Sequence, residues 1–383
     1  MNFSFETTPR ILCEQGSTRR LGDIARELGM RHVYLVTDRF LHESGLTREA
    51  EASLAAAGLR VTVFADVQAD PPEGSVEDAV ADAVAKGVDG VIGLGGGSSM
   101  DTAKLVALLA RTPQPLPSIY GIGLAKGPRL PLIQVPTTAG TGSEVTAISI
   151  ITTPTSEKKG VVSPLLYPDV AVLDSLLTLG LPPRVTAMTG VDAMVHAIEA
   201  YTSRVKKNPL SDALALKALV LLHDNIRTVV NDGGNADARE AMLLGSLFAG
   251  MAFANAPVAA VHALAYPLGG HYHLPHGLTN ALVMVPVLAF NMPVAAPLYA
   301  QLGRAMLPSM QSADDATASA AFLDAIRKLV AEMPFEQTLR AAGVPEGDLP
   351  MLATDAMKVT RLLVNNPRDV TYEDVLGIYG AVL

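Results

Sequence analysis

The feature that most constrains the fold is a change of pattern at Leu181-Pro182-Pro183, near the middle of the 383-residue chain. Before it, continuous apolar runs alternate with amphipathic stretches, which predicts a parallel sheet covered by helices on both faces. After it, helical patterns follow one another with short Gly, Pro and Asn breaks. We therefore expect an α/β domain over 1–181, an all-helical domain over 182–383, and a ligand site in the cleft between them.

Individual elements follow from their residue types. Apolar runs rich in Val, Ile and Leu predict buried strands over 32–37, 60–64, 88–94 and 132–135. Amphipathic stretches predict helices over 46–58 and 75–87, the second capped by Ser75 and ended by Gly87. In the second half, helical patterns cover 211–231, 238–254, 313–333 and 371–382.

Composition excludes several classes of protein. The net charge is -9 and no Lys/Arg run exceeds two residues, so a nucleic-acid partner is not expected. Cys13 is the single cysteine, which forbids an intrachain disulfide and fits a reducing cytoplasm. No signal peptide is expected at the N-terminus, and no membrane partner, because Gly, Pro or charge breaks each apolar segment before about 18 residues.

A glycine-rich loop follows the predicted strand over 88–94. It consists of Gly95, Gly96, Gly97, Ser98 and Ser99 and opens a helix. Glycines let a backbone approach a phosphate closely, and the free N–H groups of a helix start attract an anion. The spacing is neither Gly-x-Gly-x-x-Gly nor a P-loop. Phosphate binding is the functional interpretation, and a tight strand-to-helix turn is the structural one.

Two further polar segments follow predicted strands. Asp38 ends the first strand, where an acidic residue can accept hydrogen bonds from ribose hydroxyls and repel a 2′-phosphate. A helix N-cap is the structural alternative for it. The stretch 136–146 interleaves hydroxyls with glycines, which suits a loop that contacts a polar ligand. A turn that satisfies its own backbone is the alternative there.

The stretch Gly190–Ala200 reads as an Ala-rich helix that carries Asp192 and His196 at i and i+4, on one face. These two side chains can hold a metal ion together, or they can simply contact each other. Four histidines lie within fifteen positions: His262, His271, His273 and His276. We expect a helix ended by Pro267 and the following Gly pair, with His276 starting the next element. Two of these histidines with the first pair would form an open Asp-His₃ site suited to Fe(II), Zn(II), Ni(II) or Co(II).

Together these motifs resemble the iron-containing (group III) alcohol dehydrogenase family along essentially the whole chain, the late Asn366-Pro367-Arg368 included. The resemblance implies a Rossmann-like N-terminal dinucleotide-binding domain and an all-helical C-terminal domain. It places the family's metal ligands on Asp192, His196, His262 and His276. It places cofactor contacts on Gly95, Gly96, Gly97, Ser98, Ser99, Asp38, Asp101, Thr137, Thr138, Thr141, Ser143 and Lys158.

The resemblance also implies an activity: NAD(H)-dependent interconversion of a primary alcohol and its aldehyde, with Fe(II), or alternatively Zn(II), as a Lewis acid. A cytoplasmic homodimer or larger homo-oligomer is expected. One departure concerns proton transfer, because Tyr266 stands where many members carry another histidine. Tyr266, His271, His273, water or a ribose hydroxyl could carry the proton, and Tyr266 could instead reshape the alcohol pocket. The alternatives are a dehydroquinate-synthase-like enzyme, a maleylacetate-reductase-like enzyme and a non-catalytic nucleotide-binding module.

Overall fold

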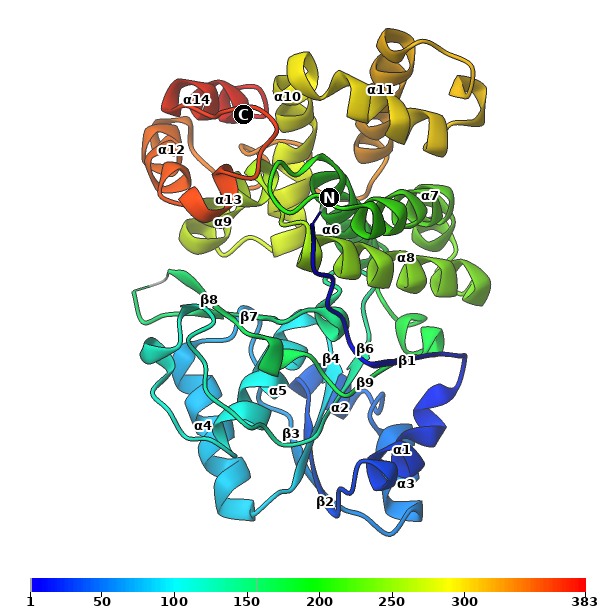
Figure 1. Cartoon of the computed structure of the whole chain (residues 1–383), viewed down its shortest axis with the longest axis vertical. Coiled ribbons are helices and arrows are strands. Elements are labelled where there is room, and N and C mark those ends of the chain that lie inside the picture. Colours follow the sequence, from blue (N-terminus) through cyan, green and yellow to red (C-terminus); the bar gives the residue numbers. More distant parts are fainter. Residues whose placement is uncertain (1, 156) are drawn as a thin grey trace. The chain divides into compact units, whose positions relative to one another are not determined.

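The computed structural model describes residues 2–155 and 157–383, which form two compact units. One unit comprises Thr7–Gly180, and the other comprises the residues up to Glu6 together with Leu181–Leu383. The first is an α/β unit and the second is helical (Figure 1). The division falls beside the proline pair at which the sequence pattern changes.

The α/β unit is built on a six-stranded sheet in which every pair of neighbouring strands is parallel. Its strand order is β1 (Arg10–Cys13), β9 (Val170–Leu173), β6 (Leu132–Pro136), β4 (Gly90–Gly95), β2 (His32–Val36) and β3 (Arg60–Phe64). The four strands predicted from apolar runs are confirmed as β2, β3, β4 and β6. A smaller sheet contains β5 (Gly121–Ile122), β8 (Lys158–Val162) and β7 (Ile148–Thr152).

Alternate side chains of the central strands pack on opposite faces of the large sheet. Val33 and Leu35 join a core with α1 (Leu21–Glu27) and α3 (Arg48–Ala56). Tyr34 and Val36 join a second core with α4 (Glu73–Lys86) and α5 (Gly97–Leu109). Both faces are therefore covered, which is why these strands are apolar throughout.

The predicted start of the helix over 75–87 is wrong. Helix α4 begins at Glu73, with Pro72 as its N-cap residue, and Ser75 lies inside the first turn. The fixed φ of a proline suits this position, so a side-chain cap is not needed to start the helix. The predicted end is confirmed, because Gly87 adopts a left-handed conformation with φ 63°.

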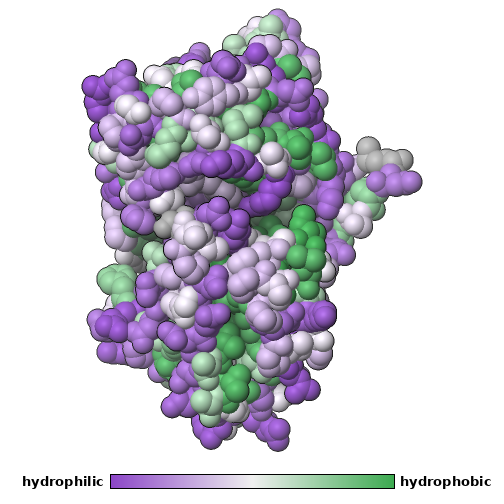
Figure 2. All heavy atoms as spheres, turned by 90° about the vertical axis from the view of Figure 1, so that its left-hand side faces the viewer, coloured by the Kyte–Doolittle hydropathy of each residue, from purple (hydrophilic) through white to green (hydrophobic). Residues whose placement is uncertain are grey.

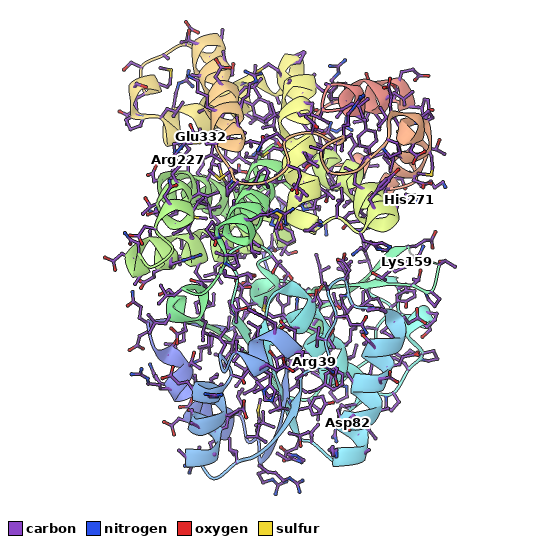
Figure 3. The ribbon with its side chains drawn as sticks, turned by 180° about the vertical axis from the view of Figure 1, so that it is seen from behind. Arg39, Asp82, Lys159, Arg227, His271 and Glu332 are labelled. Atoms are coloured by element: carbon purple, nitrogen blue, oxygen red, sulfur yellow. The ribbon has the colours of Figure 1, made fainter. Side chains whose placement is uncertain are left out.

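The helical unit surrounds α6 (Pro183–Thr202), which packs against three long helices. These are α7 (Pro209–Asn231), α8 (Ala236–Asn255) and α10 (His276–Met306). Arg227 of α7 pairs with Glu332, which directly follows α11 (Asp315–Ala331) (Figure 3). The remaining helices are α2 (Arg39–Glu43) in the α/β unit and α9 (Ala260–Tyr272), α12 (Leu349–Met357), α13 (Thr360–Leu363) and α14 (Tyr372–Gly380) here. Short 3₁₀ turns lie at Ser17–Arg20, Leu116–Ser118, Ser143–Val145, Pro164–Leu166, Ser175–Thr178, Pro308–Met310 and Glu346–Asp348.

The expectation that Pro267 and the glycine pair end a helix is wrong. Helix α9 runs through Pro267 and ends at Tyr272, with His273 as its left-handed C-cap at φ 53°. A proline removes one backbone hydrogen bond, but Pro267 and the preceding apolar residues are buried, and this packing holds the helix together. His276 does begin the next helix, as predicted.

Helix α10 also continues through three prolines, at 286, 293 and 297. By length and composition alone this apolar helix could cross a membrane, although 44% of its most apolar window is buried. It packs against α6, α9 and α11, as a core helix does. The face in Figure 2 is mostly hydrophilic, with hydrophobic residues in small separate groups.

Candidate metal centre and cofactor loops

Helix α6 carries two polar side chains, Asp192 and His196, among apolar residues. It starts with proline in its first turn, and its second half is buried on all sides. Asp192 and His196 are 3% and 5% exposed and project from the same face, one turn apart. A carboxylate is rarely buried in this way without a partner, so this face indicates a site rather than a packing surface.

The start of α10 is brought against α6 by a glycine. A Cβ atom on Gly277 would lie only 2.4 Å from the carbonyl oxygen of Met188, so no larger residue fits there without a shift. Met188 lies one turn before Asp192 on α6. The close approach therefore places His276, the first residue of α10, beside the Asp192 carboxylate: its Nε2 lies 3.8 Å from Oδ1.

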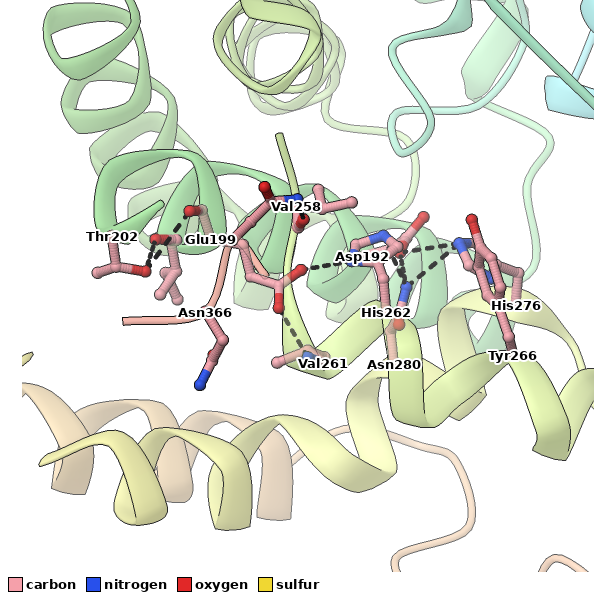
Figure 4. Close-up of polar contacts among 12 residues, drawn as sticks. Asp192, Glu199, Thr202, Val258, Val261, His262, Tyr266, His276, Asn280 and Asn366 are labelled. Carbon is pink, nitrogen blue, oxygen red and sulfur yellow. Dashed lines mark hydrogen bonds and ion pairs between the residues drawn. The ribbon is translucent and has the colours of Figure 1, made fainter. Parts of the chain in front are cut away.

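Four predicted ligands come together in the helical unit (Figure 4). Asp192, His196, His262 and His276 each offer one ligand atom, and these atoms lie within 4.8 Å of one another. The ring centroids of His196 and His262 are 4.8 Å apart, and those of His262 and His276 are 5.4 Å apart. Three of the four side chains are buried, whereas the His276 side chain is 41% exposed.

The donor set fits a divalent transition metal. Three imidazoles and one carboxylate are ligands that Fe(II) and Zn(II) share. Burial alone would raise the pKa of Asp192, but the attraction of the three imidazoles and a hydrogen bond from Asn280 leave it below its ordinary value. The carboxylate is therefore kept ionised, as a metal ligand must be.

Asn280 lies at the centre of the same cluster. Its Nδ2 is 2.5 Å from Asp192 Oδ1 and 3.2 Å from Nε2 of both His262 and His276. Its Oδ1 is buried and has no hydrogen-bond partner among the described residues. The amide thus touches three of the four ligand atoms while one of its own polar atoms remains unsatisfied.

Glu199 contacts the Nδ1 atom of the candidate ligand His262. It lies one turn after His196 on α6, and its Oε2 is 2.6 Å from His262 Nδ1 (Figure 4). Its Oε1 accepts a hydrogen bond of 2.7 Å from the backbone N–H of Val261. Both carboxylate oxygens are therefore used to fix the position and the ring orientation of one candidate ligand.

The predicted proton carriers occupy different surroundings. Tyr266 lies one turn after His262 on α9, and its ring centroid is 6.2 Å from that of His276. His271, near the end of α9 (Figure 3), instead pairs with Asp355 of α12, at 2.7 Å from Nε2 to Oδ2. The structure thus brings Tyr266 beside the four-residue cluster and holds His271 against Asp355.

The predicted cofactor residues gather in the α/β unit. Strands β2, β4 and β6 are neighbours in the parallel sheet, so their carboxyl-terminal ends lie side by side along one edge of the sheet, across the strands. Asp38 follows β2, the glycine loop follows β4, and the segment Thr137–Ser143 follows β6. Open α/β sheets bind their ligands at this edge.

The two loops pack closely on each other. A Cβ atom on Gly97 would lie 2.9 Å from Thr141 Cγ2, and one on Gly96 would lie 3.8 Å from Thr138 Cγ2. The N–H of Thr137 donates to the carbonyl of Gly95 at 3.0 Å. The N–H groups of Gly97 to Ser99 begin helix α5 and have no preceding helical turn to bond to, which suits an anion.

Asp38 and Lys158 both have structural partners. Asp38 caps α2, because its Oδ1 accepts a hydrogen bond of 2.9 Å from Leu41 N–H. Lys158 forms an ion pair with Asp70. The backbone N–H of Asp70 in turn donates to Ser98 Oγ at 3.2 Å, so this pair lies beside the glycine loop.

A buried charged network underlies the same loops. Asp101 Oδ1 accepts a hydrogen bond of 2.6 Å from Ser143 Oγ, and its Oδ2 accepts one of 2.8 Å from Ile150 N–H. Lys104 Nζ donates to Ser143 Oγ and to the carbonyl of Ile148, both at 2.7 Å. Burial lowers the pKa of Lys104 to about 8 and raises that of the neighbouring Glu144 to about 7.

Sequence reasoning singled out none of Glu199, Asn280, Lys104 and Asp70. The sequence did contain a signal for Glu199 and Asn280, because each is a polar residue one helical turn after a proposed ligand. Glu199 follows His196 by three positions, and Asn280 follows His276 by four. Lys104 likewise follows Asp101 by three positions. No local spacing pointed to Asp70.

Comparisons with known protein families agree with this arrangement. A family model described as "Iron-containing alcohol dehydrogenase" matches residues 8–175. One described as "Fe-containing alcohol dehydrogenase family, C-terminal" matches residues 186–383. The two matches together span nearly the whole chain.

Individual relatives match over nearly their full length. The "Probable alcohol dehydrogenase EutG" of Escherichia coli (strain K12) is 38% identical over 379 residues, covering 99% of this chain and 94% of that protein. The crystal structure of a 1,3-propanediol oxidoreductase superposes with a TM-score of 0.96 at 33% identity, covering 100% of both chains. Sulfoacetaldehyde reductase from Bifidobacterium kashiwanohense, solved with NAD+, gives a TM-score of 0.89 at 28% identity, covering 100% and 99%.

Proposed function

The chain belongs to the iron-containing alcohol dehydrogenase family, and from this premise we propose how its own residues carry out the reaction. It is an oxidoreductase that interconverts alcohols and aldehydes. The proposed reaction is reversible: a primary alcohol and NAD+ give the aldehyde, NADH and a proton. The observation that carries this proposal is the cluster of Asp192, His196, His262 and His276.

The helical unit would hold the metal through these four side chains. We assign Fe(II) as the ion, with Zn(II) as the alternative, because both accept imidazole and carboxylate ligands. A bound divalent ion supplies a Lewis acid that lowers the pKa of an alcohol. Glu199 holds His262 so that its Nε2 faces the other ligands, and Asp192 supplies the negative charge of the set.

The α/β unit would bind NAD. The glycine loop at the start of α5 would hold the pyrophosphate through backbone N–H groups, with Thr137, Thr138 and Thr141 beside it. Asp38 would accept hydrogen bonds from the adenosine ribose and disfavour a 2′-phosphate, so NAD would be preferred over NADP. The Lys158–Asp70 pair lies next to Ser98 and would contact the cofactor from that side. Asp101 and Ser143 would act by holding this loop in place.

Tyr266 is the proposed proton carrier. Its ring lies next to His276, the most exposed member of the cluster, and its phenol oxygen accepts a hydrogen bond from Arg361. The phenol therefore lies beside the exposed ligand, where it would exchange a proton with the oxygen of a bound substrate. His271 remains the second candidate, although its Asp355 contact occupies one ring nitrogen.

The presence of all four ligand positions favours this activity over a metal-free maleylacetate-reductase-like reaction. It also gives no support to a non-catalytic nucleotide-binding role. We further propose that the enzyme is cytoplasmic and forms a homodimer or larger homo-oligomer. Light scattering of the purified protein tests the oligomeric state.

The decisive experiment follows NADH at 340 nm with purified protein, with and without Fe(II) or Zn(II), over a panel of primary alcohols and aldehydes. We expect metal-dependent turnover in the wild type. His262→Ala should lose both the bound metal and the activity. His223→Ala, which changes a histidine on α7 outside the cluster, is the matched control and should keep both. A fully active, metal-free His262→Ala enzyme would overturn the proposal.

A further inference from the structure

An arginine from a distant part of the sequence lies against Tyr266. Arg361 belongs to the short helix α13, 95 positions after Tyr266. Its Nη2 is 3.3 Å from the Tyr266 phenol oxygen, and its Cζ is 5.7 Å from the centroid of the tyrosine ring. The tyrosine therefore fixes the place of the guanidinium from two sides, through its hydroxyl and its ring.

This contact links Arg361 to the four-residue cluster through one side chain. The ring centroid of Tyr266 is also 6.2 Å from that of His276, and Figure 4 shows the tyrosine next to that ligand. His276 is the ligand with the most exposed side chain. A single side chain, Tyr266, therefore connects the guanidinium to the most exposed ligand of the proposed reaction centre.

The charge of Arg361 is not neutralised by the protein. Across residues 2–155 and 157–383, no carboxylate forms an ion pair with it. Asp355 on the neighbouring helix α12 is engaged by His271 and Lys358, at 2.7 and 2.6 Å. Arg361 is exposed, so its remaining N–H donors are available to a ligand. A guanidinium presents these donors in a planar fork that matches an anionic oxygen group.

An aromatic ring lies against a different ligand of the cluster. The ring of Phe253 stacks on that of His196 with centroids 4.4 Å apart. A substrate at the cluster would therefore meet an aromatic ring by His196 and a phenol by His276, with the cation next to that phenol. This asymmetry suits a small molecule with a reactive oxygen at one end and a negative charge at the other.

We propose that the substrate of this enzyme is a short aldehyde, or the matching primary alcohol, that carries an anionic group recognised by Arg361. A carboxylate, sulfonate or phosphonate supplies the required chemistry. The inference rests on the proposed function, because it places the reactive carbon at the Asp192/His262/His276 end. It makes Arg361 the residue that determines specificity and Tyr266 the residue that positions it.

The test compares substrates of matched shape with the metal-loaded enzyme and NADH. Sulfoacetaldehyde is paired with 3,3-dimethylbutanal, and 4-oxobutanoate with 4-methylpentanal. Each pair differs chiefly in the charge of the distal group. We expect kcat/KM of the wild type to favour the anionic member by about 10- to 150-fold, the range that charge-assisted hydrogen bonds give.

The variants separate recognition from general damage. Arg361→Met should remove this preference by lowering kcat/KM for the anionic aldehydes far more than for the neutral ones, while Arg361→Lys should keep part of the preference because it retains charge without the fork. Arg327→Met changes an exposed arginine of α11 that pairs with Asp324 and serves as the control. Equal loss on both members of a pair in Arg361→Met, or no preference in the wild type, overturns the inference.

A binding measurement keeps the two proposals distinguishable. Calorimetric titration of the metal-loaded enzyme with 2-hydroxyethanesulfonate and with 3,3-dimethylbutan-1-ol needs no turnover. Tighter binding of the sulfonate that disappears in Arg361→Met supports the anion site even if hydride transfer fails. Turnover of neutral aldehydes without any anion preference leaves the proposed function standing and refutes the role of Arg361.

Discussion

Removing the Glu199 carboxylate tests whether the metal centre depends on more than its four ligands. In the structure Glu199 Oε2 lies 2.6 Å from His262 Nδ1, and both side chains are 4% exposed. If Nδ1 carries the proton and donates it to Glu199, the lone pair of Nε2 is left free for a metal. Loss of the acceptor frees the ring to rotate and to adopt the other tautomer.

The expected cost is a weaker metal site. Changes of this kind reduce metal affinity by about 10- to 100-fold, which corresponds to roughly 1.4 to 2.7 kcal/mol. Glu199→Gln should lie near the lower figure, because its amide oxygen can still accept from either His262 or Val261. Glu199→Ala should lie near the upper one, and it should also destabilise the fold by about 1–3 kcal/mol by leaving the buried Val261 N–H unsatisfied.

The assay is the dissociation constant for Zn(II) or Fe(II), measured by competition with a chelator, alongside urea unfolding of the metal-free protein. Glu77→Gln, an exposed glutamate of α4, makes the same chemical change away from the site. His262→Ala sets the scale for complete loss of one ligand. A folded Glu199→Ala protein that binds metal within twofold of the wild type would refute the positioning role.

Two further predictions concern the α/β unit. Asp38→Asn keeps the N-cap oxygen of α2 but removes the charge, so the ratio of kcat/KM for NADP to that for NAD should rise roughly tenfold or more; an unchanged ratio counts against the ribose contact. Burial raises the pKa of Glu144 to about 7 from 4.5, so between those pH values the folded protein binds a proton that the unfolded chain does not. Stability should therefore fall as pH rises through this window, by roughly 1 kcal/mol per pH unit at most, and urea unfolding of Glu144→Gln should show a smaller fall.

Local patterns predict several of the buried strands, although β9, which is apolar and buried throughout, was not predicted. Strands β2, β4 and β6 read clearly because they are buried on both faces and hence apolar throughout. Strands β1 and β8 escaped prediction because their sequences, Arg-Ile-Leu-Cys and Lys-Lys-Gly-Val-Val, mix charge with apolar residues over a few positions. Only pairing with a distant strand makes such short segments extended. The same tertiary support carries α9 through Pro267, where the sequence indicated an end.

The functional residues also divide into those that local spacing identifies and those that only the fold brings together. Asp192 and His196 are found by spacing, because one helical turn alone places them on a common face. Glu199 and its partner His262 are 63 positions apart in the sequence. Arg361 and Tyr266 are 95 positions apart, so no local rule connects either pair. Metal chemistry tolerates little variation in its ligands and leaves a pattern in the sequence. Substrate choice needs only one suitable side chain near that centre, supplied by whichever helix packs there, and α13 brings an arginine to Tyr266. The charge of the substrate is therefore the property that the folded arrangement indicates and the spacing of the motifs does not.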